Sequence, residues 1–315
     1  MINEKNLTET SIKKQFVQFI TTLQQQIIAA LEKTDGSRKF RTDKWTRPEG
    51  GGGLTCVMEQ GNVFEKAGVN TSAVEGILPE TMKAALAVSG DNFFATGLSL
   101  VLHPLNPFVP TVHANWRYFE LYDDNNTVID SWFGGGTDLT PYYVFPEDGR
   151  HFHTTLKNVL DEFDRTFYPA FKKQCDEYFI NKHRGNEARG IGGIFYDYLR
   201  PVEHRDAEWF FRFQQANGNA FLPSYLPLVE RRCSLPFSGQ HKEWQEYRRG
   251  RYAEFNLVHD RGTLFGLKTN GRTESILMSL PPTVRWKYDF HPQPGSKEAE
   301  LEEYLKPRNW VEESS

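Results

Sequence analysis

Three polar side chains at alternate positions could form a reactive group: His113, Asn115 and Arg117, in the stretch HANWR. The surrounding residues have the period-two pattern of a β-strand, in which successive side chains point to opposite faces. The three side chains would therefore share one face, with Trp116 on the other. An imidazole, an amide and a guanidinium together can bind an anion and donate a proton. The alternative is the wet face of an ordinary antiparallel sheet, which carries the same residue types.

A second strand is predicted just before the first, in the stretch TGLSLVLHP at residues 96–104. Ser99, Val101 and His103 would share a face by the same alternation. If the two strands pair, a hydroxyl group and a second imidazole join the group formed by the first strand.

A single carboxylate, Asp138, follows three glycines and stands among aromatic residues in WFGGGTDLTPYY. Glycine permits a sharp bend and the close approach of another group. We expect a bend here, at which a bulky ring could approach the backbone and Asp138 could act as a general base. The alternative is an ordinary turn or a helix N-cap.

Cofactor motifs give little support to other chemistry. RGIGGIF ends in phenylalanine where a dinucleotide fingerprint needs glycine, and EGGGGLT lacks the lysine of a P-loop. The nine histidines show no strong zinc spacing, and the three cysteines are widely scattered. In NGRTES, backbone amides and Arg272 could hold a carboxylate, although this stretch taken alone favours a simple hairpin turn.

The elements that must position these residues indicate one α+β domain spanning residues 1–315, with an antiparallel sheet and flanking helices. Apolar spacing predicts a helix over 16–31 that ends before Gly36. Further helices are expected over 154–183 with a break at Pro169, from about 198 to 216, and in the tail at 295–306. Strands are expected at 112–121, at 189–197 and, as a pair joined at DRG, within 251–269. Residues 47–53 are expected to form a flexible loop.

Composition narrows the class of protein. The chain has 315 residues, 38% of them hydrophobic, and a net charge of −4, so it has no general attraction to nucleic acid or anionic membranes. It contains no apolar run as long as a membrane span. The first fifteen residues lack the features of a secretory signal or a transit peptide. These features predict a cytoplasmic protein.

Five long stretches resemble one family, the oxygen-dependent coproporphyrinogen-III oxidases. They are GLSLVLHPLNPFVPTVHANWRYF, WFGGGTDLTPYY, FKKQCDEYF, RGIGGIFYD and RRGRYAEFNLVHDRGTLFGLKTNGRTESILMSLPP. The resemblance implies a large antiparallel sheet flanked by helices on both faces. It also implies aerobic conversion of the ring A and B propionates of coproporphyrinogen III to vinyl groups, giving protoporphyrinogen IX, carbon dioxide and hydrogen peroxide. A tetrapyrrole carrier without catalysis and a histidine-metal hydrolase are the alternatives.

Residue roles follow from the resemblance alone. It implies that His113 donates a proton and that substrate is contacted by Ser99, Asn115, Trp116, Arg117, Asn270, Gly271 and Arg272. Arg117 and Asp138 are expected to join His113 in catalysis. Three features depart from the family pattern: the stretch HRGNEARG is one residue longer than usual, Tyr198 stands where an acid is common, and Asn270 stands where glycine is usual.

The resemblance also bears on cofactors and assembly. Dioxygen is the expected co-substrate, with no organic cofactor. Some members are described as binding a divalent metal through histidines that match His103, His113, His151 and His183, and others are described as needing none. We favour chemistry without metal, because His113 cannot easily serve as both a permanent ligand and a proton donor. A homodimer joined through residues 252–287 is expected.

Overall fold

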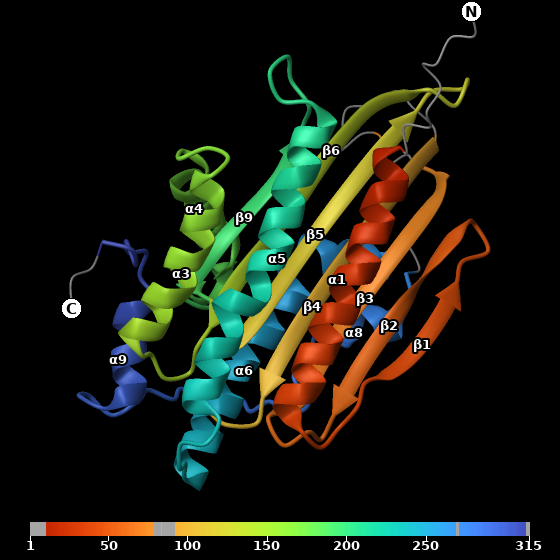
Figure 1. The fold of residues 1–315 in the computed structure, drawn as a ribbon. Coiled ribbons are helices and arrows are strands. Elements are labelled where there is room, and N and C mark those ends of the chain that lie inside the picture. Colours follow the sequence, from red (N-terminus) through yellow and green to blue (C-terminus); the bar gives the residue numbers. More distant parts are fainter. Residues whose placement is uncertain (1–10, 79–82, 84–91, 269–270, 313–315) are drawn as a thin grey trace, which may run out of the picture.

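The computed structural model describes residues 11–78, 83, 92–268 and 271–312. Within these ranges, seven strands form one antiparallel sheet in the order β1-β2-β3-β4-β5-β6-β9 (Figure 1). The strands are β1 Arg41–Thr46, β2 Gly51–Glu59, β3 Phe64–Ile77, β4 Asn92–Pro104, β5 Thr111–Tyr122, β6 Val128–Thr140 and β9 Gly192–Leu199. Strands β1 to β6 follow one another in both the chain and the sheet. At the end of this series, β6 also pairs with β9.

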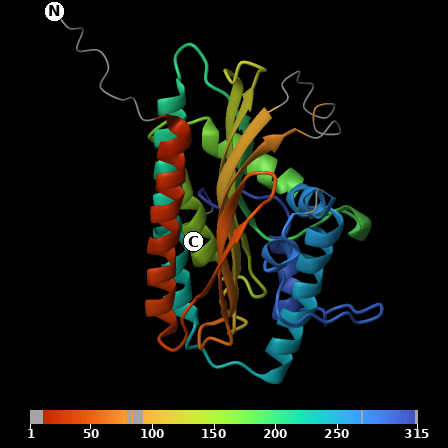
Figure 2. The same ribbon diagram turned by 90° about the vertical axis from the view of Figure 1, so that its right-hand side faces the viewer.

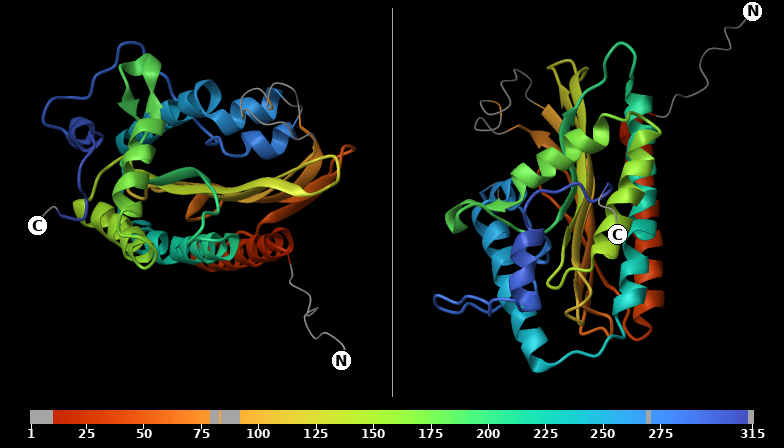
Figure 3. Two further views of the ribbon diagram at one scale, coloured as in Figure 1. Left: turned by 90° about the horizontal axis from the view of Figure 1, so that it is seen from above. Right: turned by 90° about the vertical axis from the view of Figure 1, so that its left-hand side faces the viewer.

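Helices cover both faces of the sheet (Figures 2 and 3). One layer contains α1 Ile12–Asp35, α3 Pro146–Asp161 and α5 Ala207–Arg232, and the other contains α6 Gly239–Val258, α7 Arg261–Lys268 and α8 Thr273–Leu277. At the β9 side lie α4 Phe167–Tyr178, β7 Ile180–Asn181, the 3-10 turn Lys182–Arg184, β8 Glu187–Ala188 and α9 Lys297–Tyr304. The predicted α+β architecture with a helix-flanked antiparallel sheet is confirmed. In the described part of the chain, no helix combines the length and apolarity needed to cross a bilayer.

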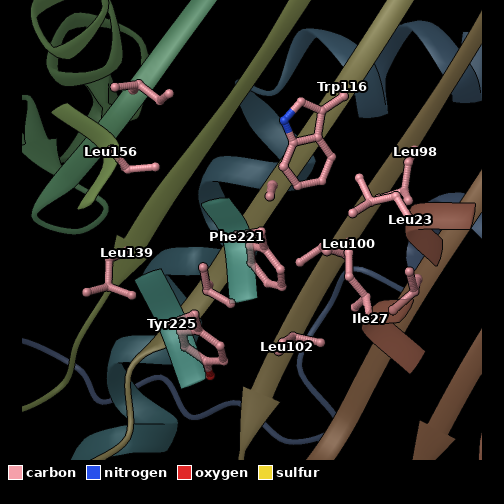
Figure 4. Close-up of a cluster of buried hydrophobic side chains, with 14 of the residues drawn as sticks. Leu23, Ile27, Leu98, Leu100, Leu102, Trp116, Leu139, Leu156, Phe221 and Tyr225 are labelled. Atoms are coloured by element: carbon pink, nitrogen blue, oxygen red, sulfur yellow. The ribbon is translucent and has the colours of Figure 1, made fainter. Parts of the chain in front are cut away.

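The main hydrophobic core lies between the sheet and the α1/α5 layer (Figure 4). Period-two burial along β4 places Leu98 and Leu100 in this core, and both have no exposed surface. Opposite them, Ile27 from α1 and Phe221 from α5 are also fully buried. The core therefore fixes which face of β4 and β5 remains for polar side chains.

The terminal helices match the prediction. The helix expected over 16–31 is α1, which ends where Gly36 adopts a left-handed conformation with φ of 71°. The tail helix is α9, and its Leu301 is buried against Tyr142 and Trp244 rather than facing solvent.

The prediction of a flexible loop at 47–53 is wrong for residues 51–53, which belong to β2. Gly51 and Gly53 belong to β2 and pair with Val74 and Ser72 of β3. A Cβ atom on Gly53 would lie 2.5 Å from the Trp45 ring, so glycine makes room for that indole on the neighbouring strand. The glycines allow close packing here and do not indicate a loop.

Helix boundaries differ from the prediction in two places. The helix expected over 154–183 is divided into α3 and α4 by residues 162–166, and Pro169 lies in the first turn of α4. A proline is tolerated there because first-turn N–H groups have no partner within the helix. The helix expected to end near 216 continues to Arg232 despite Pro223 and Pro227.

The pair of strands expected within 251–269 is wrong, because this segment forms the end of α6 and then α7. α6 begins at Gly239, and its buried Trp244, Tyr247, Tyr252 and Phe255 recur at helical spacing. The Asp-Arg-Gly sequence begins a new helix, where Asp260 accepts a hydrogen bond from the Thr263 backbone at 2.7 Å.

Candidate active site

The predicted polar face exists and lies on the side of the sheet covered by α6, α7 and α8. Ser99 pairs with Asn115, and Val101 pairs with His113, so the side chains expected to share a face do so. Asn115 is 8% exposed, and the His113 side chain is 18% exposed. An ordinary wet sheet face is therefore excluded at these two positions.

His113 belongs to a chain of hydrogen bonds that runs from this face into the interior. Its Nδ1 lies 2.7 Å from Oδ1 of Asp138, its cross-strand partner on β6. Arg189 donates from Nη2 to the other oxygen, Oδ2, at 2.7 Å, and from Nη1 to Asn256 at 2.9 Å. Both oxygens of the carboxylate are thus engaged.

The electrostatics of the chain keep Asp138 ionised. Burial raises the pKa of the Asp138 carboxyl group, but the charge of Arg189 and the hydrogen bond from His113 outweigh burial and lower the pKa below its ordinary value. Burial lowers the pKa of Arg189, but the charge of Asp138 outweighs this effect and raises it. The Arg189 guanidinium also lies over the Phe179 ring at 4.1 Å.

The bonding fixes which His113 nitrogen faces the site. An ionised carboxylate only accepts hydrogen bonds, so Nδ1 of His113 carries a proton and donates it to Asp138. Nε2 then faces Asn115, whose Nδ2 lies 3.2 Å away. His113 can therefore accept or release a proton at Nε2, on the polar face.

The structure corrects the expected surroundings of Asp138. The residue lies within the regular strand β6 rather than at a bend, and the next helix, α3, begins only at Pro146. The helix N-cap alternative is therefore wrong. Asp138 is only 2% exposed, so it contacts His113 and Arg189 rather than an approaching ring.

The glycine run instead keeps the polar face free of side chains. Gly134 pairs with Arg117, and Gly136 pairs with Asn115. A Cβ atom on Gly134 would lie 2.7 Å from Oδ1 of Asp197 and 3.2 Å from Nη2 of Arg117. Any side chain at this position would disturb the arginine.

The two predicted arginines lie at separate places on the site. The Arg117 side chain is 44% exposed, with Nη2 at 3.6 Å from Oδ2 of Asp197. Arg272 is the N-cap residue of α8 and forms an ion pair with Asp43 of β1. Gly271 donates its backbone N–H to Gly266 at 2.8 Å, and Asn270 lies outside the described residues.

Trp116 is the predicted substrate-binding residue whose side chain the structure places elsewhere. The alternation of β5 turns its indole away from His113 and Arg117, into the core against Phe221 (Figure 4). The side chain is 1% exposed. The indole lies on the face opposite to His113, as expected from the alternation, so the backbone of Trp116 is the part that would contact a substrate on the polar face.

A strip of polar residues crosses five strands beside His113. The cross-strand pairs join Asp43 to Thr55, Thr55 to Asn70, Asn70 to Ser99, and Ser99 to Asn115. We call these five residues the polar strip. Sequence reasoning missed three of its members because β1 to β3 carry no motif and their register decides which residues align.

The four histidines considered as metal ligands do not come together. His103 lies on the polar face but bonds through Nε2 to the Ser279 carbonyl at 2.9 Å, and burial lowers its pKa well below the ordinary value. His151 contacts the Pro223 carbonyl at 3.0 Å in the α3/α5 layer, and His183 contacts Glu254 at 2.9 Å near the end of α6. Among the described residues, no three His, Cys, Asp or Glu side chains are placed to hold a metal ion. The four histidines therefore do not form the metal site that the resemblance offered as one possibility, because each side chain has a separate partner.

Arg189 is the main residue to which sequence reasoning gave no role. It precedes the glycine-rich segment that leads into β9, the strand paired with β6. The available signal was an arginine just before β9, the strand that pairs with the strand carrying the isolated acid Asp138. Its significance depended on Asp138 being buried, which the sequence did not show.

Comparison with known proteins identifies the family. A model of the coproporphyrinogen III oxidase family matches residues 15–310. The chain belongs to the coproporphyrinogen III oxidase family. It is 50% identical to "Oxygen-dependent coproporphyrinogen-III oxidase, chloroplastic" of Glycine max, over 96% of this chain and 81% of that protein. It is 49% identical to "Coproporphyrinogen-III oxidase 1, chloroplastic" of Arabidopsis thaliana, with the same coverage.

A third relative extends the agreement. The oxygen-dependent coproporphyrinogen-III oxidase of Nicotiana tabacum, also chloroplastic, is 48% identical over 96% of this chain and 78% of that protein. The prediction of an oxidoreductase of porphyrin biosynthesis is thus confirmed at the level of the family.

Proposed function

We propose that the polar face of this sheet carries out the reaction of the family, the oxygen-dependent oxidative decarboxylation of coproporphyrinogen III. Each ring A or B propionate loses carbon dioxide and a hydride equivalent and becomes a vinyl group. Dioxygen takes the hydride equivalent together with one proton and becomes hydrogen peroxide. The observation that carries the proposal is the His113–Asp138–Arg189 chain, which holds an imidazole nitrogen on the polar face.

Two amide oxygens are suited to bind the pyrrole N–H groups of the substrate. Oδ1 of Asn115 and Oδ1 of Asn70 are buried and have no hydrogen-bond partner among the described residues. A buried acceptor without a partner is destabilising, so native proteins rarely keep one without a reason. Substrate N–H groups would supply the missing donors, and the Ser99 hydroxyl stands between the two amides.

Two arginines are suited to bind substrate carboxylates. A guanidinium group forms two parallel hydrogen bonds with a carboxylate. The Arg117 side chain is 44% exposed, and its ion pair with Asp197 is long at 3.6 Å, so it can exchange this partner for a substrate carboxylate. Arg272, with Gly271 before it, stands at the start of α8 over the β1 end of the polar strip.

The proton route assigns separate roles to His113 and Asp138. His113 exchanges a proton with the reacting substrate at Nε2, which is general acid–base chemistry. Asp138 touches no open space on the polar face, so we assign it as a positioning residue that fixes the orientation and tautomer of His113. This assignment replaces the direct general-base role expected from the sequence.

An aerobic and an anaerobic assay on coproporphyrinogen test the function directly. Product formation, followed by porphyrin fluorescence after oxidation of the product, should require dioxygen. NAD and S-adenosylmethionine should not restore activity under strict anaerobiosis. Undiminished anaerobic turnover would contradict the proposal, and binding without any turnover would favour a carrier.

The proposal includes the assembly expected from the sequence, a homodimer of single-domain subunits joined through residues 252–287. Supporting it, Leu257, Val258, Leu267 and Trp286 of that segment are exposed by 39–56%. Large exposed apolar side chains that gather in one segment are typical of an interface. Sedimentation should show a dimer, and Trp286→Glu should weaken it; a monomeric wild type would refute this part.

We retain the cytoplasmic location expected from the sequence as a proposal. The three named relatives are chloroplastic, so the two compartments are clear alternatives. Cell fractionation with an antibody to the native protein distinguishes them, and recovery in an organelle would overturn this assignment.

A further inference from the structure

A cavity of about 350 Å³ lies beside the polar face, on the β9 side of the sheet. We call it the lateral cavity. Its walls come from the C-terminal half of α4, from residues 180–192 and from the end of α9. Figure 1 shows that α4 and α9 both lie on this side of the molecule. None of the residues assigned above to substrate binding lines it.

The lateral cavity has a charged mouth and a mostly apolar floor. Arg184, Glu302 and Lys306 are exposed lining residues. The buried lining residues include Cys175, Phe179, Ile191 and Leu305, which are at most 8% exposed. Three more carboxylates line the cavity: Asp138, which is buried, and Asp176 and Glu187, whose side chains are 17% and 28% exposed.

Only one layer of side chains separates this floor from the reactive imidazole. The Phe179 ring centre lies 5.8 Å from that of His113. Asp138 lines the cavity while its Oδ1 lies 2.7 Å from Nδ1 of His113. The cavity therefore reaches the site from the side, rather than through the polar face.

We propose that the lateral cavity binds dioxygen and delivers it to the His113 side of the active site. This inference rests on the proposed function. A macrocycle bound on the polar face would cover the accessible side of His113 and obstruct entry from that direction. Dioxygen is small and apolar, so it partitions into an apolar space. A macrocycle with four carboxylates does not bind favourably in such a space.

The chemistry of Cys175 is compatible with oxidants passing this floor. Burial raises the pKa of the Cys175 thiol well above its ordinary value, so it remains protonated at neutral pH. Hydrogen peroxide oxidises a thiolate readily, whereas a buried, protonated thiol is comparatively inert.

Steady-state kinetics with dioxygen as the varied substrate test the inference. Ala188 lines the lateral cavity, and Ala188→Phe would fill part of it. We expect this variant to show a several-fold higher KM for dioxygen, with unchanged KM for coproporphyrinogen and unchanged kcat at saturating dioxygen. Ala170→Phe is the matched control, because it adds the same ring at an exposed position of α4 outside the cavity. It should leave all three constants unchanged.

A second variant and a direct binding measurement cover the case in which Ala188→Phe does not fold. Leu305→Trp narrows the cavity from the end of α9 and should raise the same KM. Wild-type crystals under xenon pressure should show xenon on the floor beside Phe179, as apolar cavities do. An unchanged KM for dioxygen in the folded variants, or no xenon in the cavity, would overturn the inference while leaving aerobic turnover intact. Product formed by the wild type without dioxygen would instead overturn the proposed function and this inference together.

Discussion

Asp138→Asn tests how the buried chain supports catalysis, because it removes one charge while nearly preserving shape. Asparagine can donate to Nδ1 of His113 through its amide, which favours the wrong imidazole tautomer for proton exchange at Nε2. General acid–base catalysis by a positioned side chain contributes about 10²–10⁴-fold to a rate. We therefore expect kcat to fall by about 10²–10⁴-fold, with a smaller change in KM for coproporphyrinogen.

The same substitution should also destabilise the fold. Arg189 and Asp138 are 3% and 2% exposed, and the charge of each compensates the other. Removing one partner of a buried ion pair costs about 3–5 kcal/mol, because a charge remains buried without compensation. Since Oδ1 of asparagine can still accept from Arg189, we expect a loss in the free energy of unfolding near the lower end, about 3 kcal/mol.

A second substitution separates the two effects. In Asp138→Asn/Arg189→Met both charges are absent, and methionine can pack against Phe179 and Tyr252 where the guanidinium lies. Replacing a buried ion pair by apolar groups is often neutral. The double variant should therefore regain much of the stability of the wild type but none of the activity.

Urea unfolding and aerobic turnover, measured on the same preparations, provide the assay. The kcat values should be compared under conditions in which each variant is fully folded. Wild-type kcat in Asp138→Asn would refute the positioning role of the carboxylate. A double variant no more stable than the single variant would refute the argument from uncompensated charge.

Four further substitutions test other parts of the structure. Arg117→Lys and Arg272→Lys each keep the charge but lose the planar fork, so substrate affinity should fall by about 1.5–3 kcal/mol in a direct binding titration; unchanged affinity in both would mean that neither binds a carboxylate. Trp116→Leu should lower the free energy of unfolding by about 2–4 kcal/mol in urea while leaving KM for coproporphyrinogen unchanged, since the indole lies in the core; a large rise in KM alone would contradict this placement. Asp35 accepts backbone hydrogen bonds from Val63 and Phe64, which together with the Ser37 hydroxyl outweigh burial and lower its pKa to about 2. Its folded pKa lies below the unfolded value, so the stabilisation of roughly 2 kcal/mol is present above pH ~4 and is lost as the pH falls through about 2. Asp35→Asn should lose this contribution at pH 7 and flatten the pH dependence of unfolding between those values; an unchanged pH profile would contradict the assignment.

The sequence predicted the fold where a periodic pattern met no competing signal. Strands β4 and β5 and helix α1 were recognisable because each buries one face against the core. The prediction failed for residues 251–269, where short apolar runs suited a strand as well as a helix. Helical spacing became visible only from Trp244 onward, and α6 buries charged residues such as Arg249, which is fully buried.

The residues of the candidate site were likewise predictable only where a local pattern placed them. Alternation along one strand was enough to place His113, Asn115 and Arg117 on a common face. Local sequence could not show that Asp138 is buried, because that depends on the pairing of β6 with β5 and on Arg189 from a distant segment. Nor could it reveal Asn70, whose position opposite Ser99 is a matter of register.

The arrangement of the polar strip is suited to binding the substrate. Its neutral members, Thr55, Asn70, Ser99 and Asn115, lie on β2 to β5. Arg272 lies over the β1 end, and Arg117 lies on β5 two residues beyond Asn115. Since neighbouring strands are about 4.8 Å apart, the span from β1 to β5 is roughly 19 Å. A macrocycle with N–H donors at its centre and carboxylates on its periphery complements this pattern.

A carrier would need that complementarity and nothing more. The chain of His113, Asp138 and Arg189 adds no further contact for carboxylates on the polar face, because Asp138 and Arg189 are buried and hydrogen-bonded to each other. Burying such charges stabilises a fold little, if at all, compared with apolar residues of similar volume. What the chain does provide is a histidine with one nitrogen bonded to a carboxylate and the other directed at the substrate face. That arrangement serves proton transfer, so it favours an enzyme over a carrier.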